Sequence, residues 1–248
     1  MRIVGCTNKG LNKLNNEDCI IIGDKIFNND SEFNVISSDI FTFLVFDGVG
    51  GNNAGEIASY TAAEFFSNKV SLKSQESIVH NIQVANNTII EKSMQKLEYK
   101  NMATTIAGIS INENDFISFN VGDSRVYRYR QGVLHQFTKD HTYYQELLDK
   151  GVSNDISFKY KNSHIITKCL GIYSLLPEDI NINYVENGVL PEDIFIICTD
   201  GITDMVTDDE INNIIDSCES ANQIYEKIIK MVHTNGAKDN YSLIIIQI

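Results

Sequence analysis

The sequence predicts an α+β fold, a sandwich of two mainly antiparallel β-sheets flanked by α-helices in an α-β-β-α order. Apolar, strand-like runs dominate the 248 residues, and most are joined by short connections. Helical periodicity is gathered mainly in two blocks, at about 54–97 and 208–232. Helices grouped in this way favour antiparallel sheets with the helices outside over an alternating parallel fold. No linker or repeat divides the chain, so we expect one domain over residues 1–248.

The N-terminal half begins with strands and continues with helices. Apolar runs predict strands at 2–6, 19–22 and 41–46. Residues 23–39 are rich in Asn, Asp, Ser and Gly, and they predict a hairpin connection with only fragments of strand. Apolar residues then recur at spacings of three and four in two stretches between 54 and 97, which predicts two amphipathic helices.

The C-terminal half is expected to add most of the remaining strands and three helices. Strands are expected at 103–111, 116–121, 125–130, 133–137, 164–170, 181–186, 193–199 and 241–248. Helices are expected at 143–150, closed by Gly151, and at 208–217 and 221–232. The polar and weakly patterned stretch that follows the first of these helices predicts a mobile flap at about 143–164.

Charge and composition exclude several classes of protein. The chain has 20 Lys and Arg against 33 Asp and Glu, a net charge of −13. It therefore offers no basic field for nucleic acid or for an anionic membrane surface. Its five cysteines are scattered without a Cys-x-x-Cys pair, which is typical of reduced thiols. No signal-peptide core or run of ~18 apolar residues occurs, so we expect a cytoplasmic protein.

Acidic residues stand at the ends of the apolar strands. These positions are Glu17 with Asp18, Asp47, Asp123, Asp200 and Asp239. A single Asp-Gly is usually only a turn, because Asp tolerates turn geometry and Gly supplies positive φ. Strand ends of one sandwich converge on an edge, however, so we expect these carboxylates to meet there without a basic residue nearby to neutralise them.

Clustered carboxylates at a partly buried rim are costly unless cations bridge them. Oxygen ligands without suitably spaced His or Cys select Mg²⁺ or Mn²⁺. Two such ions can share a carboxylate, lower the pKa of a bridging water and clamp an in-line displacement at phosphorus. The sequence therefore predicts a metal centre with Asp47 as its hub.

The acidic residues belong to an ordered series of motifs that covers nearly the whole chain. The motifs are Asn16-Glu17-Asp18, Phe46-Asp47-Gly48-Val49-Gly50-Gly51, Ala103-Thr104-Thr105, Val121-Gly122-Asp123-Ser124-Arg125, Cys198-Thr199-Asp200-Gly201 and Lys238-Asp239-Asn240. This series resembles the metal-dependent type 2C (PPM) Ser/Thr protein phosphatases. The short Gly-Gly version after Asp47 is similar to bacterial members of that family.

The resemblance implies a role for each acidic position. Asp47 would bridge two ions, one completed by the backbone carbonyl of Gly48 and by Glu17 or Asp18. Asp200 and Asp239 would bind the other ion. Asp123, together with Asp200, would bind a third, weaker ion. Asn240 would orient the ligands without binding an ion itself. The implied reaction is a single-step attack by metal-bound hydroxide on phosphoserine or phosphothreonine. The implied partners are phosphorylated proteins, substrates of a Ser/Thr kinase, and we expect a monomer.

Two departures from the family pattern keep alternatives open. Lys13 stands where the family often has an arginine that grips the substrate phosphate, and Val49 stands where eukaryotic relatives carry a histidine thought to protonate the leaving group. A lysine offers a point charge in place of a planar fork. A catalytically silent phosphoprotein-binding module and a phosphomonoesterase for small molecules are therefore the competing hypotheses.

Two further side chains have both a structural and a functional interpretation. Arg125 either forms an ion pair or contacts phosphate, and the sequence favours the ion pair. His141 either has a structural role or assists protonation, and the structural role is favoured because isolated histidines are commonly inert.

Overall fold

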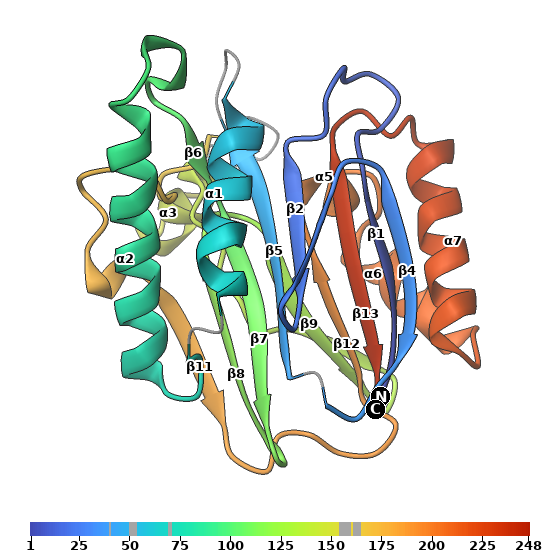
Figure 1. The fold of residues 1–248 in the computed structure, drawn as a ribbon. Coiled ribbons are helices and arrows are strands. Elements are labelled where there is room, and N and C mark those ends of the chain that lie inside the picture. Colours follow the sequence, from blue (N-terminus) through green and yellow to red (C-terminus); the bar gives the residue numbers. More distant parts are fainter. Residues whose placement is uncertain (40, 50–53, 69–70, 154–159, 161–164) are drawn as a thin grey trace.

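Two antiparallel β-sheets stacked face to face form the middle of the molecule, and helices cover both outer faces (Figure 1). The computed structural model describes all residues except 40, 50–53, 69–70, 154–159 and 161–164. Every strand pairing within the sheets is antiparallel. This arrangement confirms the α+β sandwich that the sequence predicts.

The first sheet contains both ends of the chain. Its order is β10 (Val133–Gln136), β9 (Arg125–Arg130), β12 (Ile194–Cys198), β13 (Tyr241–Gln247), β1 (Arg2–Asn8) and β4 (Ser31–Ile36). The second sheet has the order β11 (Asn181–Val185), β8 (Asp115–Val121), β7 (Ile106–Asn112), β5 (Thr42–Val49), β2 (Asp18–Ile22) and β3 (Lys25–Asn28), with β6 (Ala103–Thr104) added to the end of β5.

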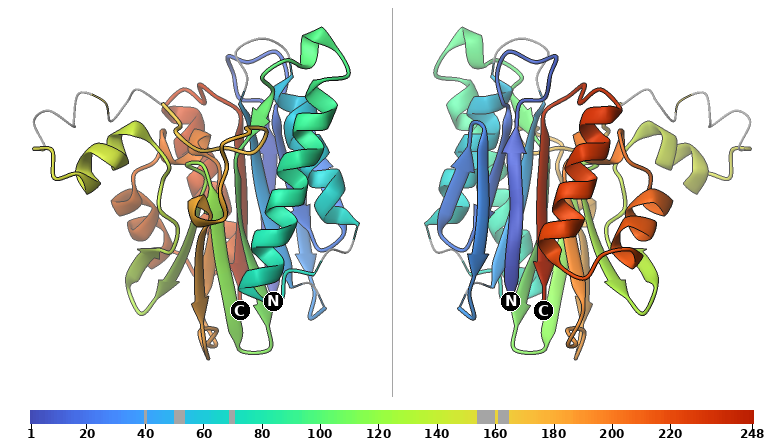
Figure 2. Two further views of the ribbon diagram at one scale, coloured as in Figure 1. Left: turned by 90° about the vertical axis from the view of Figure 1, so that its left-hand side faces the viewer. Right: turned by 90° about the vertical axis from the view of Figure 1, so that its right-hand side faces the viewer.

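The helices form the two outer layers. The second sheet is covered by α1 (Gly55–Ser67) and α2 (Gln75–Ser93), and the first sheet by α5 (Asp200–Thr203), α6 (Asp208–Asp216) and α7 (Ala221–Thr234) (Figure 1). Short 3-10 helices lie at Leu97–Tyr99 and Pro177–Asp179. Helix α3 (Tyr143–Asp149) projects away from the sheets (Figure 2) and has no fully buried residue. Among the described residues, no helix combines the length and the apolar character needed to cross a bilayer.

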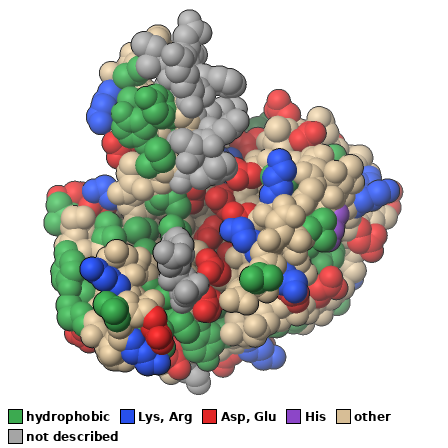
Figure 3. Space-filling model, turned by 90° about the horizontal axis from the view of Figure 1, so that it is seen from above, with side chains coloured by type: hydrophobic (Ala, Val, Ile, Leu, Met, Phe, Trp, Pro, Cys, Tyr) green, Lys and Arg blue, Asp and Glu red, His purple; other side chains and the backbone are tan. Residues whose placement is uncertain are grey.

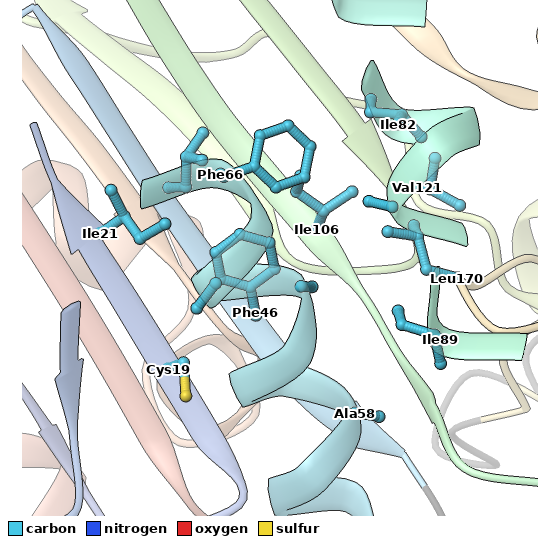
Figure 4. Close-up of a cluster of buried hydrophobic side chains, with 14 of the residues drawn as sticks. Cys19, Ile21, Phe46, Ala58, Phe66, Ile82, Ile89, Ile106, Val121 and Leu170 are labelled. Atoms are coloured by element: carbon cyan, nitrogen blue, oxygen red, sulfur yellow. The ribbon is translucent and has the colours of Figure 1, made fainter. Parts of the chain in front are cut away.

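Three apolar layers hold the sandwich together. One lies between the sheets, and the other two lie between each sheet and its helices, as Figure 4 shows for α1 and α2. Central strands serve two layers at once because successive side chains point to opposite faces. Ile196 faces the helices of the first sheet, and its neighbour Ile197 faces the second sheet. The uninterrupted apolar runs of β12 and β13 follow from this burial on both faces.

Two sequence expectations about secondary structure were wrong. Residues 25–28 and 31–36 form the complete strands β3 and β4, because β2 and β1 supply their pairing partners. The described part of the expected strand 164–170 makes only isolated bridges, through Ile166 and Leu170. The strand propensity of a segment cannot predict either result, because a strand is stabilised by the neighbouring strand that pairs with it. Residues 154–159 and 161–164 of the expected flap, His164 among them, lie outside the described residues.

The layer between the sheets should dominate stability. Phe195 is completely buried there, and its ring meets that of Phe116 edge-on at 5.1 Å between centroids. Phe195→Ala should lower the free energy of unfolding by about 3–5 kcal/mol, because it removes the buried ring and leaves a cavity. Leu97→Ala, at a side chain that is 88% exposed, should change it by less than about 0.5 kcal/mol. Urea unfolding of both variants tests this, and equal effects would contradict the layered core.

Candidate metal centre

The acidic residues gather at one end of the sandwich. Strands β5, β8 and β12 end there, whereas β2 and β13 begin there (Figure 1). Asp18 and Asp47 are directly opposite each other on the paired strands β2 and β5. Like charges in that position are destabilising. The structure thus brings the predicted carboxylates together, as the convergence of strand ends requires.

Side chains along a strand point alternately to its two faces, and this alternation explains which side chains meet at the centre. Along β2 and β5, Asp18 and Asp47 continue the faces of Ile20 and Val45, which fill the layer between the sheets. Thr199 and Ser242 likewise follow the inward face of the first sheet, next to Ile197 and Ile244. The apolar layer between the sheets therefore gives way at this rim to carboxylates from one sheet and hydroxyls from the other.

Asp47 is held by its backbone and crowded by other acids. Its N–H donates to Thr105 Oγ1 at 3.0 Å, and its carbonyl accepts from Thr104 Oγ1 at 2.9 Å. Burial raises the pKa of Asp47 well above its usual value, and the charges of Asp200, Asp18 and Asp123 raise it further. Its carboxyl group is within hydrogen-bonding reach of Asp200. Two carboxyl groups can share such a bond only if one keeps its proton.

Asp18 is the most deeply buried carboxylate of the centre. It is 1% exposed, and its Oδ2 accepts hydrogen bonds from Thr199 Oγ1 at 2.9 Å and Ser242 Oγ at 2.7 Å. Its Oδ1 is buried and has no partner in the described part of the structure. Burial raises the pKa of Asp18 to about 7, against the two hydroxyl donors, which lower it. An oxygen left without a donor in a buried site is suited to a cation or an ordered water.

Glu17 and the carbonyl of Gly48 lie beside each other at the start of α1. A side chain at Gly55 would come within 2.5 Å of Glu17 Oε2 and 2.8 Å of the Gly48 carbonyl oxygen. Gly48 itself donates its N–H to the Glu17 carbonyl at 3.1 Å. Burial raises the pKa of Glu17, and Glu56 adds to the rise. The two oxygens expected to complete one ion site are therefore close together, and glycine is required for that approach.

Asp123 lies in the turn between β8 and β9. It is 6% exposed, its Oδ1 is buried without a partner among the described residues, and it lines the same groove as Asp200. Burial and the nearby charges of Asp200 and Asp140 raise its pKa well above the usual value. The structure thus places Asp123 beside Asp200, on the side of the centre that faces α3.

Asp239 lies at the opposite side of the centre and is paired with a lysine. Lys13 Nζ is 2.6 Å from Asp239 Oδ1, and both side chains are about half exposed. Burial tends to lower the pKa of Lys13, but the hydrogen bond to Asp239 and the charges of Glu17 and Asp47 outweigh it and raise the pKa. The expectation that no basic residue lies near the carboxylates was therefore wrong, because the loop after β1 folds back onto the centre.

Asn240 joins three segments of the backbone. Its Oδ1 accepts from the Glu17 N–H at 3.0 Å, and its Nδ2 donates to the carbonyls of Lys9 at 3.0 Å and Asn15 at 2.9 Å. These three hydrogen bonds are directed at the loop that carries Lys13 and Glu17. The side chain holds that loop against the start of β13.

The donor set fits hard divalent cations. In the described part of the chain, no three His, Cys, Asp or Glu side chains stand close enough around one point to enclose an ion by themselves. Mg²⁺ and Mn²⁺ do not need this, since they bind through one or two carboxylates and keep several waters. The partnerless oxygens of Asp18 and Asp123, and the proximity of Asp47 to Asp200, are the features that cations would relieve.

Arg125 and His141 both have structural partners. The Arg125 guanidinium forms a forked ion pair with Asp140, with its shortest contact at 2.6 Å, which confirms the ion-pair interpretation. His141 Nδ1 accepts from the Gly122 N–H at 3.0 Å, and its Nε2 lies 3.1 Å from Asn181 Nδ2. Nδ1 therefore fixes the turn that carries Asp123, and Nε2 faces the start of β11.

Sequence reasoning missed the hydroxyl donors at the rim. Thr199 and Ser242 are completely buried and bind Asp18, yet no motif singled out Ser242. The signal was present, since each lies two residues beyond an inward-facing isoleucine in its strand. Carrying the two-residue period past the ends of the apolar runs would have identified them.

A groove beside the carboxylates gives access to the centre. It has a volume of about 850 Å³, and Asp123, Asp200, Arg125, Tyr144 and Asp204 are among the residues that line it. Figure 3, which shows this end of the molecule, has Asp and Glu side chains gathered in its central hollow. The groove runs between the sandwich and α3.

Comparisons with known proteins agree on one family. A family model described as Protein phosphatase 2C matches residues 21–240. The serine/threonine phosphatase stp of Listeria monocytogenes is 28% identical over 216 residues, which cover 82% of this chain and 83% of the relative.

Solved structures share the fold over the whole chain. The S. agalactiae serine/threonine phosphatase has a TM-score of 0.83 at 23% identity and covers 100% of both chains. The catalytic domain of the serine/threonine protein phosphatase PstP, in complex with two manganese ions, has a TM-score of 0.76 at 22% identity and covers 99% of this chain and 98% of the other.

Repulsion at the centre should appear as a pH-dependent loss of stability when metal is removed. The pKa of Asp47 is higher in the folded than in the unfolded chain, so its ionisation opposes folding increasingly as the pH rises above about 4. In EDTA, Asp47→Asn should therefore be more stable than the wild type at pH 8, by roughly 1–3 kcal/mol, and the gain should shrink at pH 5.

Urea unfolding at the two pH values measures this difference. The exposed Asp24 is the matched control, and Asp24→Asn should change stability by less than about 0.5 kcal/mol at either pH. A gain for Asp47→Asn that is the same at pH 5 and pH 8 would rule out the predicted repulsion.

Proposed function

This chain belongs to the protein phosphatase 2C family and is a serine/threonine protein phosphatase of the bacterial type, and we propose that it hydrolyses phosphoserine and phosphothreonine in proteins with two divalent cations. The resemblance inferred from the sequence motifs is thereby confirmed. The single observation that carries the proposed mechanism is the crowding of Asp18, Asp47 and Asp200 at the rim, where one carboxyl must keep its proton unless cations are present.

The proposed ligands divide into two sets that share Asp47. Glu17 and the Gly48 carbonyl would hold one ion with Asp47, and Asp200 and Asp239 would hold the other. The two manganese ions bound to PstP support this count. When bound, the ions supply Lewis-acid chemistry, since they activate a water for single-step attack at phosphorus and neutralise the phosphate oxygens. Mn²⁺ and Mg²⁺ both suit such oxygen ligands.

Other acidic residues would support these two sets. Asp123 lies where it could hold a third, weaker ion with Asp200. Asp18 uses one oxygen on Thr199 and Ser242, which fixes its free oxygen toward the centre. Asn240 holds the Glu17 backbone in place.

Lys13 is proposed to bind the substrate phosphate. Its ammonium lies at the centre, held by Asp239, and it is half exposed. A cation on Asp239 would compete for the same carboxylate oxygen and release the ammonium. The freed lysine could then donate a charge-assisted hydrogen bond to the phosphate.

Neither Val49 nor His141 is placed to protonate the departing hydroxyl. Val49 lies two residues on in β5 and carries no proton to donate. His141 is engaged through both ring nitrogens. We therefore propose that solvent protonates the leaving serine or threonine.

We further propose a cytoplasmic, monomeric enzyme that acts in signalling by reversing a Ser/Thr kinase. The acidic chain supports this, since it lacks a basic surface for nucleic acid or anionic lipid. The groove between α3 and the sandwich is the proposed path of the phosphoprotein, and a mobile flap at about 143–164 stays a prediction.

Phosphate release should depend on metal. The purified protein should release phosphate from a phosphothreonine peptide with Mn²⁺ or Mg²⁺ and not in EDTA. Asp200→Asn should lower the rate about 100-fold or more, because each ion contributes several kcal/mol to the transition state. Asp24→Asn is the matched control and should keep the wild-type rate. Turnover that persists without metal would overturn the proposal.

Lys13 distinguishes an active phosphatase from a silent binding module. Lys13→Ala should lower kcat/KM roughly 10- to 100-fold, the value of a hydrogen bond to a charged group. Lys13→Arg should raise kcat/KM several-fold, because a planar fork can bind phosphate through two hydrogen bonds. Steady-state kinetics on a phosphothreonine peptide measure both. Binding of Mn²⁺ and phosphopeptide without turnover in any of the three proteins would favour the silent module.

A further inference from the structure

A third oxygen donor lies beside Glu17 and the Gly48 carbonyl. The two come together over Gly55, whose missing side chain leaves the space that Glu17 Oε2 occupies. Glu56 is the next residue, in the first turn of α1. Its negative charge acts on Glu17, so the two carboxylates are close enough to repel each other. Nothing in the proposed ligand set uses Glu56.

One carboxylate oxygen of Glu56 is buried without a partner. Oε2 is shielded from solvent and has no hydrogen bond to any of the described residues. Tyr60 and Lys92 line the same cavity as Glu56, yet in the described part of the chain neither forms a hydrogen bond or ion pair with it. A carboxylate oxygen desolvated in this way is costly unless a cation or an ordered water binds it.

A second partnerless oxygen belongs to the same cavity. Asp18 lines it, is 1% exposed, and leaves Oδ1 without a donor. The cavity has a volume of about 740 Å³, which leaves room for waters beside the carboxylates. Asp18 and Glu56 therefore line one cavity, and each has a buried carboxylate oxygen without a hydrogen-bond partner among the described residues.

We propose that Glu56 is a positioning residue of the metal centre, which helps to hold the divalent cation bound by Glu17 and the Gly48 carbonyl. This inference rests on the proposed function. Because Glu56 follows Gly55 directly, the first turn of α1 supplies both the space for Glu17 and an additional negative charge. The cation in turn offsets the repulsion between Glu17 and Glu56.

The test is the affinity for Mn²⁺, measured by calorimetric titration of the full chain at pH 7.5. Glu56→Gln should weaken one of the binding events about 10- to 100-fold, the usual effect of removing a group that supports a metal ligand. Glu56→Ala should do the same, so the result does not depend on how glutamine is accommodated. The matched control is Glu64→Gln, an exposed residue of the same helix, which should bind as the wild type does.

Unfolding by urea separates this function from a purely structural one. In EDTA, Glu56→Gln should be at least as stable as the wild type, because a repulsive charge is removed. With saturating Mn²⁺ it should gain less stability than the wild type does. An equal loss in EDTA and in Mn²⁺ would mean a structural residue and would overturn the inference.

The outcomes also separate the inference from the proposed function. If the wild type binds Mn²⁺ and both Glu56→Gln and Glu56→Ala bind it with the same affinity, the inference is overturned but the proposed function is not. Wild-type protein that binds no Mn²⁺ would overturn both.

Discussion

Repulsion between carboxylates at one end of the sandwich is the constraint on which the rest of the centre depends. Asp18 and Asp47 face each other across a strand pair, and Asp200 is within hydrogen-bonding reach of Asp47. Burial makes each charge more costly, since water is no longer available to screen it. A site that keeps several acids together under these conditions is less stable without cations than with them. The proposed metal binding would therefore be linked to folding stability.

The scaffold tolerates this cost because its other parts are strongly held. Three apolar layers fix the strands, so the strand ends cannot separate to relieve the charges. Uncharged hydroxyl groups bind the acidic residues. Thr199 and Ser242 donate to the Asp18 carboxylate, and Thr104 and Thr105 bind the backbone of Asp47. Hydroxyls stabilise the charged form of a carboxylate without neutralising it. The two hydroxyls on Asp18 thus favour its charged form, which is the form that a cation would bind.

Lys13 gives the centre a second means of charge balance. Its ion pair with Asp239 is half exposed and so contributes little to stability. A weak pair is easily exchanged, and the same ammonium could serve Asp239 in the absence of metal and a phosphate in its presence. Glu56 has the opposite effect, because its negative charge repels Glu17 and so favours a bound cation. Acidic and basic residues around Glu17 therefore act in opposite directions on the same site.

The sequence by itself determined the sandwich, the family and the acidic positions, because apolar periodicity and motif order are local properties of the chain. It did not reveal strands β3 and β4, the ion pair of Lys13, the donors Thr199 and Ser242, or the partnerless oxygen of Glu56. Strand β3 pairs with β2, its neighbour in the chain, but most of the other features depend on residues far apart, such as Ser242 bonding Asp18 across the layer between the sheets. Only the tertiary structure decides which distant groups meet, because pairing and burial set the cost of every charge and hydrogen bond there.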